Sequence, residues 1–93
     1  MLSQFPIDLD KVSKEDLDKE ILRLGMIAEL DAVSLYEQLA SKTKNVKIKK
    51  ALLDIAKEEK THIGEFQTLL LELDKEQVKE LENGRKEIEE MSE

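Results

Sequence analysis

Cysteine and tryptophan are absent from the 93 residues, and glycine and proline together supply only four of them. Without cysteine the chain can form no disulfide scaffold, no thiolate metal site and no cysteine nucleophile. Glycine and proline are the residues that most often interrupt helices, so their scarcity favours long helices. Aromatic residues make up only 3 % of the chain. Any metal site in this chain must therefore use oxygen and nitrogen ligands. The many Leu, Lys and Glu residues favour helix.

The chain also lacks an excess of basic residues over acidic ones, and it lacks long apolar runs. The 22 acidic residues outnumber the 15 basic ones, and the formal net charge of −7 argues against nucleic-acid binding. No apolar run approaches the roughly 18 residues that a membrane-spanning helix needs. Residues 1–8 lack the basic start and apolar core of a signal peptide. We therefore expect a cytoplasmic protein with no nucleic-acid partner and no membrane partner.

What the chain does have is 40 % hydrophobic residues within a length that suits one small domain, residues 1–93. A domain of this size buries a modest fraction of its surface and is marginally stable alone. A few long helices enclose little core, so the remaining apolar side chains need apolar surface on another chain. The composition therefore predicts a homo-oligomer.

The hydrophobic pattern predicts an all-α protein. The expected elements are an extended lead-in over residues 1–12 and three helices over about 13–42, 45–73 and 75–91. Ser13, Asn45 and Asp74 are the expected N-caps, since short polar side chains satisfy the free amides of a first turn. A short break separates the first two helices, which predicts an antiparallel hairpin that dimerises into a four-helix bundle. The third helix has a thin apolar face.

Two charged residues interrupt the apolar stripe of the second helix. Its members are spaced alternately by four and three residues: Ile48, Leu52, Ile55, Glu59, His62, Phe66, Leu69 and Leu73. Glu59 and His62 are three residues apart, so their side chains project from the same face. Charged residues rarely occupy such faces unless they are paired or bind a metal.

The first helix carries one matching charge. Its stripe comprises Leu22, Gly25, Glu29, Ala32, Val33, Tyr36 and Ala40. Gly25, one turn before Glu29, is small enough to let another backbone approach. Glu29 lies about 14 residues before the turn, and Glu59 and His62 lie about 16 to 19 after it. At about 1.5 Å per residue, the three side chains are expected at similar heights on the hairpin.

This ligand set fits half of a dinuclear iron or manganese site. Carboxylates and imidazole suit these cations. Dinuclear sites in four-helix bundles use one Glu from each of two helices and a Glu-x-x-His from each of the other two. One chain supplies Glu29, Glu59 and His62, so two chains related by a two-fold axis supply the whole set. The alternatives are a structural adaptor, in which a buried Glu–His pair fixes dimer register, and a protein that binds metal without oxidising it.

Two segments resemble rubrerythrin-type ferritin-like proteins. Residues 28–40, AELDAVSLYEQLA, are similar to the first helix of that superfamily, and residues 58–66, EEKTHIGEF, resemble its EEKxHxxEF ligand helix. The two motifs occur once in a chain that ends after a third helix. The chain is therefore most similar to the encapsulated ferritin family, which includes the ferritin-like domain fused to the shell protein in some archaeal encapsulins.

The resemblance implies a half-ferritin with ferroxidase activity, which oxidises Fe(II) with oxygen for iron storage. It implies that Glu59 bridges two irons and that Glu29 and His62 are further ligands. It also implies that Tyr36 hydrogen-bonds near the ligands and that Asp31 lies on the route by which iron arrives. The implied assembly is a ring of dimers, as in a decamer, inside an encapsulin nanocompartment.

Overall fold

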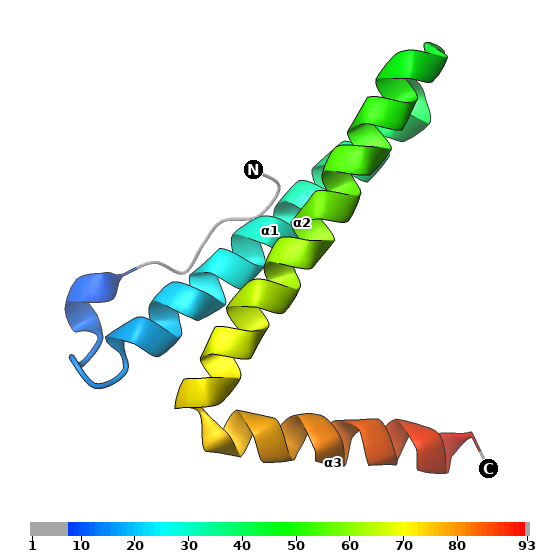
Figure 1. Ribbon diagram of the computed structural model, residues 1–93. Helices are drawn as coiled ribbons and strands as arrows, with labels where there is room; N and C mark the ends of the chain where they lie inside the picture. The colour runs from blue at the N-terminus through cyan, green and yellow to red at the C-terminus, as the bar shows by residue number, and fades with distance from the viewer. Residues whose placement is uncertain (1–7, 93) are drawn as a thin grey trace.

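The computed structural model describes residues 8–92 and contains three α-helices preceded by one 3-10 turn. The 3-10 turn covers Leu9–Lys11, and the helices are α1 (Leu17–Lys42), α2 (Val46–Leu73) and α3 (Lys75–Met91). Figure 1 shows α1 and α2 lying side by side as an antiparallel hairpin, with α3 leaving the end of α2 in a different direction. The prediction of an all-α chain with a two-helix hairpin and a third C-terminal helix is confirmed, and the described residues contain no strand.

The helix boundaries follow the local capping chemistry at two of the three predicted N-caps. The Asn45 side chain accepts a hydrogen bond from the Ile48 amide, and the Asp74 side chain accepts one from the Gln77 amide, both at 3.0 Å. α1 begins at Leu17, four residues later than predicted. The Ser13 hydroxyl accepts from the Asp16 amide at 3.3 Å, so Ser13 stabilises a turn that precedes the helix.

Polar contacts tie the start of α3 to the hairpin. One terminal guanidinium nitrogen of Arg23, on α1, lies 3.0 Å from the Asp74 carboxylate, and the other lies 2.9 Å from Glu20. The Gln77 amide, followed by the Arg23 guanidinium, lowers the pKa of the Asp74 carboxyl. The two carboxylates raise the pKa of Arg23. Asp74 therefore both starts α3 and ties that start to α1.

The interior of the hairpin is thin. Only Ala40, Ala56 and Leu70 are buried among the described residues. The chain has an accessible surface of 7431 Å², against about 5,500 Å² for a compact monomer of its mass. Its radius of gyration is 16.6 Å, against about 12 Å for a compact domain of this length. The fold is therefore open, and many of its large apolar side chains are exposed.

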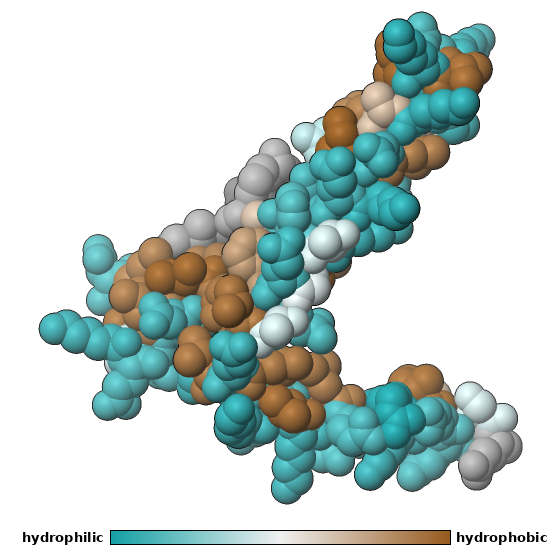
Figure 2. All heavy atoms as spheres, viewed as in Figure 1, coloured by the Kyte–Doolittle hydropathy of each residue, from teal (hydrophilic) through white to brown (hydrophobic). Residues whose placement is uncertain are grey.

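Large apolar side chains remain exposed on all three helices: Ile21, Leu30, Leu39, Val46, Ile48, Leu53, Leu69, Leu73, Val78, Leu81, Ile88 and Met91. Figure 2 shows hydrophobic residues gathered near the place where α3 departs from the hairpin and again at the opposite tip of the hairpin. Among residues 8–92, no helix is both long enough and apolar enough to cross a membrane.

Candidate metal centre

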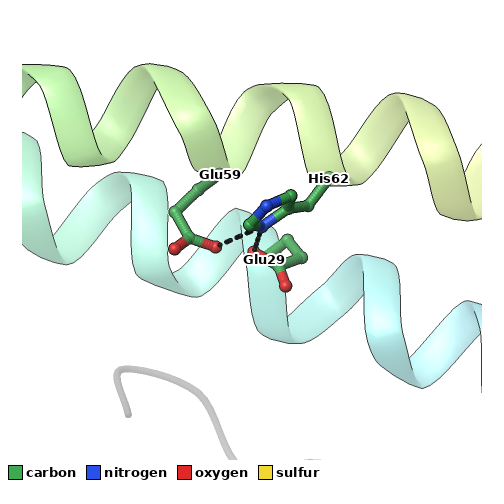
Figure 3. Close-up of side chains that lie close together, drawn as sticks. All are labelled: Glu29, Glu59 and His62. Carbon is green, nitrogen blue, oxygen red and sulfur yellow. Dashed lines mark hydrogen bonds and ion pairs between the residues drawn. The ribbon is translucent and has the colours of Figure 1, made fainter.

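The three predicted ligands meet at one point of the hairpin. Glu29 lies near the middle of α1, and Glu59 and His62 lie one turn apart on α2. One carboxylate oxygen of each Glu and one ring nitrogen of His62 all lie within 4.8 Å of one another. Figure 3 shows the two carboxylates and the imidazole directed toward the same space between the helices. Glu29, Glu59 and His62 therefore lie at similar heights along the hairpin, as the residue count from the turn predicted.

A single nitrogen of His62 faces both carboxylates. Nδ1 lies 3.4 Å from Oε2 of Glu59 and 3.4 Å from Oε2 of Glu29. A neutral imidazole whose Nδ1 is protonated can donate one hydrogen bond, so it cannot satisfy both oxygens. If Nδ1 is unprotonated, its lone pair lies beside two anionic oxygens. A cation would be attracted by all three atoms.

Glu29 contributes an oxygen that the protein itself leaves unsatisfied. Oε2 of Glu29 is buried and has no hydrogen-bond partner, because its 3.4 Å approach to His62 lacks hydrogen-bond geometry. A buried polar atom without a partner carries a desolvation cost of about 1–3 kcal/mol. Coordination of a metal ion would remove that cost. Two carboxylates and one imidazole suit iron or manganese, so the residues present fit such an ion.

The candidate centre is open on one side. The His62 side chain is 45 % exposed, whereas the side chains of Glu29 and Glu59 are 20 % exposed. The three side chains provide three donor groups, fewer than the six of a complete dinuclear bundle site. The exposed imidazole therefore marks the side on which further ligands could be added.

Tyr36 and Asp31 lie outside the group of three. Both are half-buried on α1 and line a hollow together with Ala28, Ala32 and Leu35. Within residues 8–92, no hydrogen bond joins the Tyr36 hydroxyl to Glu29, Glu59 or His62. The roles that the sequence suggested for these two residues remain predictions.

Two contacts around the centre were not predicted. Gly25 lies against the ring of Phe66, whereas the sequence suggested that another backbone would approach it. Lys60 of α2 lies 3.1 Å from Glu37 of α1, forming an exposed ion pair across the hairpin. The spacing contained a signal for the first contact, since Gly25 is four residues before Glu29 and Phe66 is four after His62.

Similarity to known proteins agrees with this fold and donor set. The sequence model of the Rubrerythrin family matches residues 20–92, and the chain belongs to this family of ferritin-like proteins. Membership is consistent with an iron-related function.

One protein and one solved structure share about half of their aligned residues with this chain. A "Ferritin-like-encapsulin shell fusion protein" of Pyrococcus furiosus is 54 % identical over 95 residues, which cover 99 % of this chain. The match covers 27 % of that relative, so the chain spans about a quarter of its length. The crystal structure of the encapsulated ferritin domain from Pyrococcus furiosus superimposes with a TM-score of 0.82 at 51 % identity, covering 97 % of this chain and 94 % of that one. The predicted resemblance to encapsulated ferritins is confirmed.

Proposed function

We propose that the protein is a ferroxidase that binds Fe(II) through Glu29, Glu59 and His62 and oxidises it to Fe(III). The observation that carries this proposal is the convergence of three donors within 4.8 Å, one of them a buried carboxylate oxygen without a hydrogen-bond partner. Iron is the substrate. Each Fe(II) gives up one electron, and dioxygen accepts the electrons and, with protons from solvent, becomes peroxide or water.

The chain supplies the ligands and their surroundings. Glu29 and Glu59 place anionic oxygens where the charge of the iron rises by one, and negative ligands favour the ferric state because its charge is higher. The resemblance of residues 58–66 to the rubrerythrin-type ligand helix suggests that Glu59 would bridge two ions. Nδ1 of His62 is the nitrogen available for coordination, since it faces the two carboxylates.

The complete site is proposed to form between two copies of the chain. One copy offers two Glu and one His, and a two-fold axis would supply four Glu and two His, the number used by dinuclear sites in helical bundles. The chain exposes about 1,900 Å² more surface than a compact monomer of its mass, which exceeds the roughly 800 Å² per partner of a standard interface. A homodimer, assembled further into a ring such as a decamer, would use that surface.

The proposed setting is an encapsulin nanocompartment in the cytoplasm. The 54 % identical relative is named as a fusion of a ferritin-like part to an encapsulin shell, which supports association of this chain with such a shell. Co-expression with an encapsulin shell protein, followed by purification of the shells, should recover this chain with them. Recovery of empty shells would contradict the proposed location without affecting the proposed chemistry.

Oxygen uptake on addition of Fe(II) tests the proposed activity. The parent protein should consume oxygen and develop ferric absorption, and Glu29→Ala or His62→Ala should slow both by more than about 10-fold, the smallest effect usual even for residues that only support a ligand. Glu65→Ala is the matched control, because Glu65 is an exposed carboxylate one turn beyond His62. Equal rates in the parent and in the Glu29 and His62 variants would show that the site is misassigned.

The same experiment separates the alternative functions. Stoichiometric metal binding without oxygen uptake would indicate metal storage or delivery, and manganese would then be tested as the bound ion. No binding at all would favour the structural adaptor. Sedimentation with and without Fe(II) tests the shared site, because a metal held between two copies should favour the dimer.

A further inference from the structure

The contact between Gly25 and Phe66 lies directly beside the candidate centre. On α1, Gly25 is one turn before Glu29, and on α2, Phe66 is one turn after His62. Because the helices are antiparallel, both one-turn steps run toward the same end of the hairpin. The contact therefore lies about 6 Å along the helix axes from Glu29 and His62.

The aromatic ring occupies the space where a side chain of residue 25 would begin. A Cβ atom placed on Gly25 would lie 3.1 Å from Cε1 and Cζ of Phe66 and 3.2 Å from Cδ1. Carbon atoms in contact are normally separated by about 3.5–4.0 Å. Even a methyl group would therefore require the ring to move or the two helices to separate by a few tenths of an ångström.

We infer that the Gly25–Phe66 contact, one turn from the candidate centre, sets the separation of α1 and α2 there, and that Gly25 and Phe66 are positioning residues for the proposed metal ligands. Glu29 stands on one helix, whereas Glu59 and His62 stand on the other, so the distance between the helices decides whether their donors converge. Helix separation at a contact depends on the size of the side chains there. Gly at position 25 permits the closest approach beside a full aromatic ring.

This inference rests on the proposed function, because it assigns a purpose to a spacing that matters only if the three side chains bind metal. The inference also accounts for the presence of a residue with low helix propensity at position 25. Glycine inside a helix is less favourable than alanine, so position 25 gives up intrinsic helix stability for the contact. The chain contains an internal comparison, since Gly64 in α2 and Gly84 in α3 have no atom within 4 Å of a built Cβ.

A set of four variants tests the packing without metal: Gly25→Ala, Phe66→Leu, the double variant, and Gly64→Ala as the control. Gly64→Ala should raise the denaturation midpoint of the 93-residue protein, because it gains helix propensity and meets nothing. Gly25→Ala should raise it less or lower it, and the gain should return when Phe66→Leu removes the ring. Additive effects of Gly25→Ala and Phe66→Leu would overturn the inference.

Co(II) binding, followed by its visible absorption and by titration, tests the positioning role on the same variants. Gly25→Ala should bind Co(II) about 10-fold more weakly and with an altered spectrum, whereas Gly64→Ala should match the parent. The double variant should recover part of the affinity. Equal Co(II) affinity and spectra in Gly25→Ala and Gly64→Ala would overturn the positioning role. If Gly25→Ala fails to fold, the double variant is compared with Phe66→Leu alone. Equal Co(II) affinity is expected, because the ring that the added Cβ would meet is gone. A further loss of affinity in the double variant would overturn the inference.

The parent protein distinguishes this failure from failure of the proposed function. A parent that binds no Co(II) refutes the proposed metal site, whatever the packing variants show. A parent that binds Co(II) normally beside a Gly25→Ala variant that does the same refutes only the positioning role.

Discussion

The hairpin and α3 are both regular helical structure, but different interactions hold them in place. α1 and α2 contact each other and contain the three residues that are buried within 8–92, Ala40, Ala56 and Leu70. α3 contains no buried residue, and its start is tied to α1 by Arg23 and Asp74. Packing therefore defines the part of the molecule that holds the candidate ligands, whereas a polar contact ties the start of α3 to that part.

Removal of buried side-chain volume should separate the two regions most strongly. Leu70→Ala should lower the free energy of unfolding by about 2–5 kcal/mol, because Leu70 is 4 % exposed and the hairpin has few other buried residues. Leu81→Ala in α3 should cost less than about 1 kcal/mol, since Leu81 is 44 % exposed. Chemical denaturation at low protein concentration measures both. Similar losses would show that α3 is packed as firmly as the hairpin.

Acid should loosen the start of α3 before it affects the apolar contacts of the hairpin. The pKa of Asp74 is lowered by the Gln77 amide and then by Arg23, so the folded state favours the ionised carboxyl. This contribution to stability is fully present above the unfolded-state pKa of about 4 and is lost as the pH falls through the lower folded-state value. The amide chemical shift of Gln77, followed from pH 7 to pH 2, should report the change.

Asp74→Asn is the matched variant for that titration. Asparagine also accepts a hydrogen bond at an N-cap but carries no charge for Arg23. The Gln77 amide shift of this variant should therefore vary less with pH in the acid range. An unchanged titration curve would mean that another carboxyl controls the start of α3.

The smallest expected effect concerns the exposed glycine of α3. Gly84→Ala should raise helix content and stabilise α3 by about 0.5–1 kcal/mol, since a Cβ there meets no atom within 4 Å. Circular dichroism and amide exchange across α3 measure the change. A loss of helix content would indicate that α3 needs the glycine for a contact outside this chain.

The hairpin and the convergence of the three candidate ligands were predictable because the helix repeat and the number of residues from the turn can be read locally from the sequence. Steps of three and four residues place Glu59 and His62 on one face, and counting from the turn brings Glu29 to their height. The start of α1 was predicted four residues too early because Ser13 can cap either a helix or a single turn. Its side chain bonds the Asp16 amide in both cases, and sequence alone does not distinguish them.

The contacts of Arg23 and Gly25 were harder to predict because each depends on a residue far away in the sequence. Arg23 reaches Asp74 only once α2 has returned along α1, and the separation of 51 residues leaves no periodic signal. Gly25 was recognised as a place of close approach. Whether a ring or a backbone fills that place depends on the rotation of α2 about its axis.

Because the connection between the helices is short, the number of residues between Glu29 and His62 determines whether their side chains meet at the candidate centre. One residue inserted into α2 before Glu59 would turn Glu59 and His62 by about 100° and shift them by about 1.5 Å, which would direct both away from Glu29. The same insertion beyond Leu73 would change only α3. Single-residue insertions and deletions in the helices between Glu29 and His62 should thus abolish metal binding, whereas those near the two ends of the chain should preserve it. The segment from Glu29 to His62 behaves as a unit of fixed length.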